Sequence, residues 1–249
     1  MKKTLLEICC GSAEDAIEAY KAGADRAELC SNLFHGGLTP SIGSLKVVKN
    51  ETDMKAVAMV RPREGGFCYT DIEFKVAIED AKALAANGAD GLVMGFLHSD
   101  GRVDVERTRI IADIAHEKGI DSVFHRAIDV VPDWKEALDI LIELNFTRVL
   151  TSGQEYDVSI ATDTVREMRE YAAGRIQIMP GAGITLKNVD RVIRETGCEQ
   201  IHLAAHKLMF DHSTANNRSI YYGGCLYPPE DQFKLTDRDV VAAIASKLT

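Results

Sequence analysis

Short apolar segments alternate with longer amphipathic segments along nearly the whole chain, and this alternation constrains the fold more than any other feature. Eight of the short segments have the length and apolar content of buried strands, and a segment of helical periodicity follows each one. Strands that are separated by helices pair in parallel. The segments predicted as strands are 5–10, 24–30, 54–61, 91–97, 122–129, 148–152, 175–179 and 200–205.

The intervening segments carry start and stop signals for helices. Ser12, followed by Asp15 three residues later, is typical of a helix N-terminus. Gly88 and Gly119 stand directly after two other segments, where a helix commonly ends. The predicted helices are 13–22, 41–50, 71–87, 105–118, 134–144, 162–173, 186–196 and 237–248.

The count of eight strands indicates an α/β chain that closes into a single (β/α)₈ TIM barrel. An open doubly wound sheet is the structural rival, but no GxGxxG motif follows the first strand. The 249 residues match the roughly 250 that such a barrel needs, so we expect 1–249 to form one domain. We predict a long loop at 207–235, which is a lid or a subunit contact, and a last helix at 236–248 that Thr236 caps.

The composition argues against several classes of partner. Apolar residues make up 46% of the chain and the formal net charge is −9, so nucleic acid and anionic membranes would be repelled. No stretch approaches the roughly 20 apolar residues of a membrane span, and no signal peptide is evident. We therefore expect a cytoplasmic protein whose six cysteines, among them Cys225, are reduced and form no CxxC pair.

Two neighbouring strands carry the same Glu-x-Cys pattern. Successive side chains of a strand point to opposite faces, so Glu7 and Cys9 share one face and Leu6 and Ile8 the other. A carboxylate is disfavoured against the helix layer, which places Glu7 and Cys9 in the barrel lumen. The same argument places Glu28 and Cys30 in the lumen at a matching depth.

Polar residues and glycines gather where the other strands end, and in this fold the C-terminal ends of the strands form the active site. They are Arg61, Arg63, His125, Arg126, Asp129, Ser152, Gly181, Gly183 and His202. A structural interpretation stays open, in which Glu7 pairs with Arg61, Glu28 pairs with Arg126, the cysteines are core residues, and the barrel is a scaffold.

An enzyme for a small anionic, phosphorylated or carboxylate substrate is one functional hypothesis. Neighbouring carboxylates repel, which raises one pKa and suits isomerase or lyase chemistry. The catalytic candidates are Glu7, Glu28, His125 and Asp129. The substrate-binding candidates are Arg61, Arg63, Arg126, Ser152, Gly181, Gly183 and His202. A divalent metal such as Mn or Zn on Glu7, Glu28 and His125 is a further alternative.

The strand-end motifs resemble the CutC family of copper homeostasis proteins. The matching stretches are 7–9, 23–30, 36–41, 61–63, 124–127, 150–153 and 179–183. The resemblance implies a (β/α)₈ barrel, a cytoplasmic location and a homo-oligomer. It also implies Cu(I) binding, with Cys9 and Cys30 as the metal ligands.

The residues agree with the copper hypothesis. Cu(I) prefers thiolates, and adjacent parallel strands lie about 4.8 Å apart, close enough for Cys9 and Cys30 to share one ion. Arg61 is expected to lower the pKa of both thiols. The sequence thus predicts a copper ion or a small anionic molecule as the partner, and no cofactor besides Cu(I) is evident.

Overall fold

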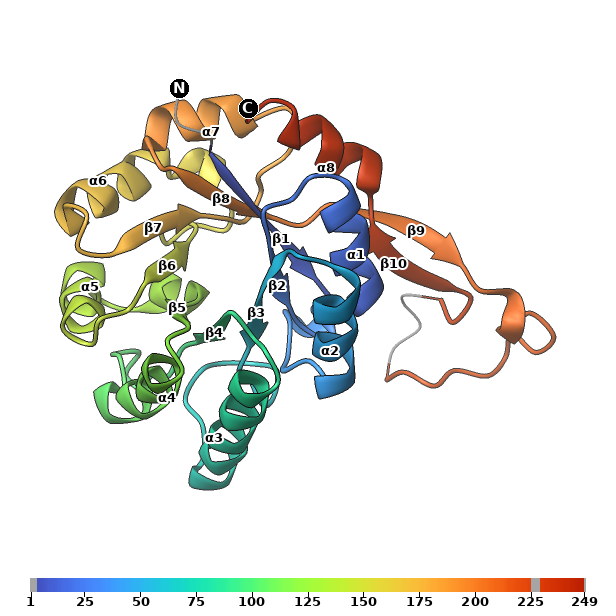
Figure 1. Ribbon diagram of the computed structural model, residues 1–249, viewed down its shortest axis with the longest axis horizontal. Helices are drawn as coiled ribbons and strands as arrows, with labels where there is room; N and C mark the ends of the chain where they lie inside the picture. The colour runs from blue at the N-terminus through green and yellow to red at the C-terminus, as the bar shows by residue number, and fades with distance from the viewer. Residues whose placement is uncertain (1–3, 225–228, 249) are drawn as a thin grey trace.

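Eight parallel strands form a ring with eight helices around it in the computed structural model, which describes residues 4–224 and 229–248 (Figure 1). From β1 to β7 each strand pairs with the next one in sequence, and β8 pairs with β1. The strands of the ring are β1 (Leu5–Cys10), β2 (Arg26–Leu29), β3 (Lys55–Met59), β4 (Gly91–Met94), β5 (Asp121–Phe124), β6 (Arg148–Thr151), β7 (Gln177–Pro180) and β8 (Gln200–Leu203). The predicted TIM barrel is confirmed.

The helices lie outside the ring, and six of the eight begin at a residue whose side chain accepts from a free backbone amide. Ser12 accepts from the amide of Asp15 at the first helix, as predicted, and Thr70 and Glu73 form a reciprocal capping box at the third. The helices are α1 (Ala13–Lys21), α2 (Ile42–Glu51), α3 (Asp71–Ala86), α4 (Val105–Glu117), α5 (Trp134–Glu143), α6 (Thr162–Ala172), α7 (Val189–Thr196) and α8 (Arg238–Ala245).

The ring has one seam, between β7 and β8. These two strands stand at the two ends of the hydrogen-bonded order, and no ladder joins them in the described part of the chain. Their neighbouring connections, from α6 to β7 and from α7 to β8, lie side by side at the amino ends of the strands. The barrel is therefore closed by side-chain packing at this seam and by backbone hydrogen bonds elsewhere.

Two separate apolar layers follow from the alternation of the strands. Leu6 and Ile8 belong to the large layer between the strands and the helices, where the hydrophobic effect stabilises the barrel. A smaller layer fills part of the lumen with Val57, Val93 and Val123 from three central strands. Buried charged residues of the lumen, among them Glu7, Arg26, Glu28 and His202, come from β1, β2 and β8, so the interior is charged on this side.

The segment after β8 is predicted as a loop at 207–235, and this prediction is wrong at both ends of the segment, where strands form. An antiparallel hairpin forms instead from β9 (His206–Phe210) and β10 (Gln232–Thr236), with Thr236 donating its amide to Asp15 of α1. The hairpin projects beside α1 (Figure 1). Because Thr236 ends a strand, the last helix is capped by Asp237 and begins at Arg238.

Several other boundaries also differ from the prediction, among them the end of the fifth strand and the start of the seventh helix. The fifth strand ends at Phe124, and its polar continuation forms a short 3₁₀ helix, Arg126–Val130. The seventh helix begins at Val189 because the residues before it form turns. None of the helices in the described residues combines the length and the hydropathy that a membrane span requires.

Candidate functional site

Glu7 is the centre of a buried polar network inside the barrel. It is 1% exposed, it accepts a charged hydrogen bond from Arg26 of the adjacent strand, and its Oε1 lies 2.8 Å from Nδ1 of His202 on β8. Register explains the grouping, because Glu7 stands level with both Arg26 and His202 in the two ladders of β1. The open alternative in which Glu7 pairs with Arg61 is therefore wrong.

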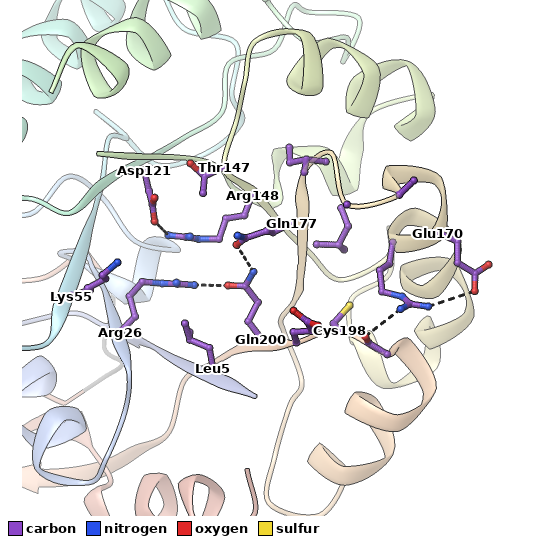
Figure 2. Close-up of a pocket in the computed structure, with 17 residues that line it drawn as sticks. Leu5, Arg26, Lys55, Asp121, Thr147, Arg148, Glu170, Gln177, Cys198 and Gln200 are labelled. Carbon is purple, nitrogen blue, oxygen red and sulfur yellow. Dashed lines mark hydrogen bonds and ion pairs between the residues drawn. The ribbon is translucent and has the colours of Figure 1, made fainter. Parts of the chain in front are cut away.

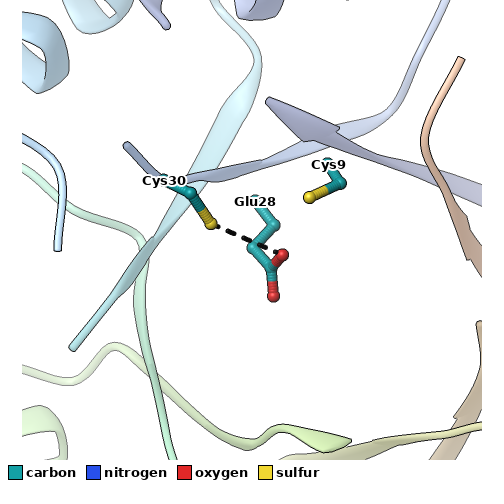
Figure 3. Close-up of side chains that lie close together, drawn as sticks. All are labelled: Cys9, Glu28 and Cys30. Atoms are coloured by element: carbon teal, nitrogen blue, oxygen red, sulfur yellow. Dashed lines mark hydrogen bonds between the residues drawn. The ribbon is translucent and has the colours of Figure 1, made fainter. Parts of the chain in front are cut away.

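Cys9, Glu28 and Cys30 come together directly above this network, as predicted from their pattern. One ligand atom of each lies within 4.8 Å of the others, and Sγ of Cys30 lies 3.7 Å from Oε2 of Glu28 (Figure 3). Glu28 and Cys30 are buried, whereas Cys9 is half-buried and reaches the mouth. The pair Cys9 and Cys30 is thus a candidate site for a soft metal ion.

A second group of three ligands shares Glu28. Glu7, Glu28 and His202 also place one ligand atom each within 4.8 Å of the others, and Nε2 of His202 lies 3.7 Å from Oε2 of Glu28. Among the described residues, the histidine of the carboxylate cluster is therefore His202. The alternative with His125 as the third ligand is wrong, because His125 lies outside both groups.

The electrostatics of the cluster separate its two carboxyl groups. Burial alone would raise the pKa of Glu7, but the positive charge of Arg26 and the hydrogen bond with His202 hold it at about 2. Burial raises the pKa of Glu28 to about 8, and the negative charges of Cys9 and Glu7 act in the same direction. Glu7 is therefore ionised at neutral pH while Glu28 retains its proton, which is the split that acid–base sites use.

The two thiols differ as well. The hydrogen bond from Cys30 lowers the pKa of Cys9 well below its usual value, and His202 acts in the same direction against burial. The same bond and burial raise the pKa of Cys30. Burial disfavours a charge on His202, yet Glu28, Cys9 and Glu7 raise its pKa well above the usual value. The expected role of Arg61 in lowering both thiol pKa values is wrong, since His202 is the cation beside Cys9.

Arg61 is buried above the apolar part of the lumen and is held by the backbone. Its two terminal nitrogens donate to the carbonyl groups of His35, Gly37 and Gly65 at 2.8 to 2.9 Å. Its Nε hydrogen points at no acceptor among the described residues. The guanidinium also stacks over Phe67 at 5.6 Å, so its orientation is fixed and one donor is left over.

His125 provides a second buried donor that has no acceptor among the described residues. Its Nδ1 accepts from the amide of Ala127 at 3.1 Å, so the ring proton is on Nε2, and this buried atom has no partner in the described structure. The ring packs on Phe67 with the centroids 4.8 Å apart. Burial and the nearby charge of Arg61 lower the pKa of His125 to about 3, so the ring is neutral.

Gly95, directly after the neighbouring strand β4, is required for the position of His125. A Cβ at residue 95 would lie 2.3 Å from Cε1 of the His125 ring. Gly95→Ala is therefore expected to lower the free energy of unfolding by about 1–3 kcal/mol, measured by urea denaturation. Gly66→Ala is the matched control, because no atom lies within 4 Å of its Cβ position. Equal stability of the two variants would contradict the tight fit.

The low pKa of His125 predicts a pH effect on stability. The folded protein holds this ring neutral down to about pH 3, whereas the ring in an unfolded chain takes up a proton near its ordinary pKa of 6.5. Stability should therefore fall as the pH drops from about 6.5 toward about 3. In His125→Gln the unfolding free energy should fall less steeply between neutral pH and about pH 4. Parallel curves for the two proteins would refute this assignment.

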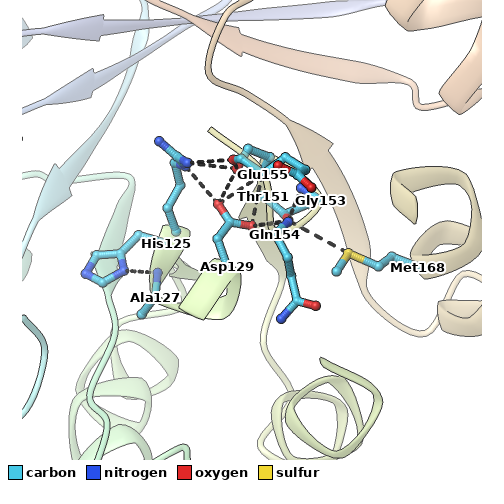
Figure 4. Close-up of polar contacts among 10 residues, drawn as sticks. His125, Ala127, Asp129, Thr151, Gly153, Gln154, Glu155 and Met168 are labelled. Carbon is cyan, nitrogen blue, oxygen red and sulfur yellow. Dashed lines mark hydrogen bonds and ion pairs between the residues drawn. The ribbon is translucent and has the colours of Figure 1, made fainter. Parts of the chain in front are cut away.

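Asp129 serves as an anchor between β5 and β6. It accepts from the hydroxyl of Thr151 at 2.6 Å, from the amide and hydroxyl of Ser152 at 2.8 to 3.0 Å, and from Nε of Arg126 at 2.8 Å (Figure 4). Arg126 also donates to the Ser152 hydroxyl at 2.7 Å. The structure thus brings Asp129, Arg126 and Ser152 together as one hydrogen-bonded unit, and Glu28 pairs with His202 in place of Arg126.

The remaining predicted residues lie at the rim. Arg63 bonds Glu73 at 2.7 Å and is partly exposed. The amide of Gly181 donates to Thr151, so it is used within the barrel. Gly183 has a φ of +77°, and a Cβ there would lie 2.2 Å from the carboxyl carbon of Asp157. A carboxylate therefore stands where the glycine turn was expected to hold phosphate.

Sequence reasoning missed Arg26, Arg148 and Gln200, which lie in the lumen below the carboxylate cluster. Arg26 donates to Gln200 at 2.8 Å, and Arg148 is 2% exposed. The sequence does contain a signal for Arg26, since Arg26 stands two residues before Glu28 and therefore shares its face of the strand. Of the cysteines, Cys225 lies outside the described residues, and the five others are free thiols.

Comparisons with known proteins identify the family of the chain. The model of the CutC family matches residues 4–207. A CutC family protein of Treponema denticola is 54% identical over 248 residues, covering all of both chains. The human copper homeostasis protein cutC homolog is 40% identical over 233 residues, which cover 94% of this chain and 85% of the human one.

Solved structures show the same fold. A crystal structure of CutC from Streptococcus agalactiae has a TM-score of 0.76 and 35% identity, and the match covers 80% of this chain and 98% of that one. Phosphoribosylanthranilate isomerase of Thermotoga maritima matches over 98% of both chains with a TM-score of 0.55, and its 13% identity supports the barrel fold alone. On the family match and on these identities, the chain belongs to the CutC family.

Proposed function

We propose that the protein binds one Cu(I) ion between Cys9 and Cys30 and acts in copper homeostasis. The observation that carries the proposal is the pair of thiols at the mouth, whose sulfur atoms and one Glu28 oxygen lie within 4.8 Å of one another. Two sulfur ligands suit a soft monovalent ion. The name of the human relative, a copper homeostasis protein homolog, supports the same function.

The surroundings of the thiols favour a thiolate-bound cation. Cys9 is held as a thiolate beside the positive His202, so it is ready to bind metal. Cys30 has a raised pKa and must release its proton when the ion binds, which couples copper affinity to pH. Because Cys9 is half-buried and Cys30 is buried, the ion enters by way of Cys9.

A Cu(I) titration against a competing chelator tests this proposal, and X-ray absorption of the loaded protein reports the ligands. One ion per chain with two sulfur neighbours is the expected result. Binding without sulfur neighbours would reject the site. The thiols must remain reduced for this chemistry, and cytosol maintains reduced thiols, so we place the protein in the cytoplasm.

We also propose that the chain forms a homo-oligomer through the β9–β10 hairpin. Three large apolar side chains of this hairpin, Leu208, Phe210 and Phe233, are 44% to 60% exposed. Exposed apolar side chains on a projecting hairpin suit a subunit contact, since burial in an interface removes them from water. Phe210→Asp is expected to lower the mass measured by light scattering with an unchanged circular dichroism spectrum. An unchanged mass would reject the contact.

A second candidate function is acid–base catalysis of the isomerase or lyase type on a small anion, and a specific observation favours it. Nε of Arg61 and Nε2 of His125 are both buried without an acceptor among the described residues, and both side chains pack on Phe67. Two fixed donors of this kind stabilise developing negative charge on a substrate oxygen. Glu28, with a pKa of about 8, would supply the proton.

Crystals soaked with small carboxylates and phosphate esters test the second candidate. An oxygen atom within hydrogen-bond distance of both donors, lost in His125→Phe, is the expected result. Binding of the same compounds with no contact to either donor would reject it. This outcome leaves the copper proposal intact, because the copper ligands Cys9 and Cys30 supply neither of the two donors.

A further inference from the structure

A cavity lies at the end of the barrel opposite to the thiols. It has a volume of about 880 Å³ and is bounded by the first residues of several strands, among them Arg26, Arg148, Gln177 and Gln200 (Figure 2). Its outer wall comes from the α6–β7 and α7–β8 connections, next to the seam of the ring. In this fold the amino ends of the strands usually serve stability and are packed. A hollow of ligand size there calls for an explanation.

The floor of the cavity contains a buried cation whose donors are not all used. Arg148 is 2% exposed, and its Nη2 forms an ion pair with Asp121 at 2.9 Å. Its Nε has no hydrogen-bond acceptor in the described residues. Burial lowers the pKa of Arg148, and the positive charge of Arg26 acts in the same direction, whereas the negative charges of Glu7 and Asp121 act against both.

The other floor groups are ordered by hydrogen bonds among themselves. Arg26 donates to Oε1 of Gln200 at 2.8 Å, and Gln200 donates to Oε1 of Gln177 at 2.8 Å (Figure 2). This series of hydrogen bonds leaves the side-chain amide nitrogen of Gln177 as an available donor at the exposed end of the series. The floor therefore presents N–H groups to the cavity.

The rim adds two cations that reach the solvent. Lys55 is exposed at the start of β3, and Arg169 of α6 lies 3.7 Å from Glu170 and donates to the carbonyl of Gly197 at 3.4 Å. The acidic residues of the lining are Asp121, Glu170 and Glu199. Four cations and three carboxylates line the cavity, and one of the cations, Arg26, is paired with Glu7 of the lumen. The most deeply buried charge of the lining is the positive one of Arg148.

We propose that this cavity binds a small oxyanion, a carboxylate or a phosphate, with Arg148 at the bottom and Lys55 and Arg169 at the rim. Guanidinium groups present planar sets of N–H donors that match such oxygens, and a charge-assisted bond would satisfy the free donor of Arg148. The site lies apart from the thiols and from Arg61 and His125, and it depends on neither function proposed for the mouth.

Calorimetric titrations with inorganic phosphate and with malonate, at constant ionic strength, test the proposal on the full chain. Saturable binding at millimolar concentration is expected, and the two probes distinguish a phosphate site from a carboxylate site. Replacing both rim cations, Lys55→Ala with Arg169→Ala, should weaken binding by at least about tenfold, since each contributes a charge-assisted contact. These side chains are largely exposed, so the variant keeps its core.

Control variants locate the ion. Arg61→Met removes the guanidinium of the mouth and should leave the phosphate affinity unchanged, as should the double variant Cys9→Ser, Cys30→Ser. In amide NMR spectra, phosphate should shift Gly174 and Gly197, which line the cavity. Absence of saturable binding, shifts confined to the mouth, or full affinity in the rim variant would each overturn the proposal.

Discussion

Cys9→Ala is expected to lower the Cu(I) affinity by more than about a hundredfold, because loss of a ligand should exceed the 10- to 100-fold effect of losing a supporting residue. Cys9 supplies one of the two thiolates, and no other cysteine in the described residues forms a ligand group with Cys30. A single thiolate beside Glu28 would leave the soft ion with hard oxygen ligands. Competition against a chelator of known affinity measures the change.

Cys10→Ala is the matched control for this experiment. Cys10 is the next residue of the same strand, but its side chain belongs to the layer under the helices and its Sγ contacts the carbonyl of Ile8 at 3.4 Å. Its substitution should leave the Cu(I) affinity unchanged. Equal affinity in Cys9→Ala and the wild type would reject the proposed site, and equal losses in both variants would indicate an indirect effect on folding.

The alternation that predicts this difference is also what made the barrel predictable. A strand exposes every second residue to one face, so the Glu-x-Cys pattern was enough to place Glu7, Cys9, Glu28 and Cys30 in the lumen. Six of the eight helices begin at a capping side chain, a signal that acts locally. Both kinds of signal lie within a few residues of sequence and do not depend on how the strands are aligned.

The partners within the lumen depend on strand alignment, which the sequence does not display. One open interpretation pairs Arg61 with Glu7, yet Arg61 follows β3 and lies higher in the barrel, where backbone carbonyls hold it. His125 and His202 both follow the lumen pattern, but only the ladder between β1 and β8 makes His202 level with Glu7. Depth in a barrel is set by register, so a residue's face was predictable while its neighbour was not.

The hairpin after β8 was missed for a different reason. Its strands are joined by a connection of about twenty residues, and the usual signal for a hairpin is a tight turn of two to five residues. The pairing of Leu208 with Lys234 is therefore a long-range contact that propensity cannot show. The anchor of β10 is the carboxylate of Asp15, whose role in capping α1 was the only one visible in the sequence.

Arg26→Met is expected to lower the free energy of unfolding by about 3–5 kcal/mol, because it leaves a buried carboxylate without its cation. Glu7 is 1% exposed and Arg26 is 4% exposed, so water cannot replace the lost partner. His202 still contacts Glu7 at 2.8 Å, but its charge is shared with Glu28 and Cys9. Urea denaturation followed by circular dichroism measures the change.

Lys82→Ala is the control that tests whether the burial of an ion pair, and not only its short distance, determines its contribution to stability. Lys82 lies 2.8 Å from Glu79, but the two side chains are 57% and 74% exposed, so the loss of this ion pair should change the unfolding free energy little. The double variant Arg26→Met, Glu7→Leu removes both buried charges and should recover most of the stability lost in Arg26→Met. If the double variant is less stable than the single one, the loss lies in packing around Arg26, and the buried ion pair is not what Arg26→Met disrupts.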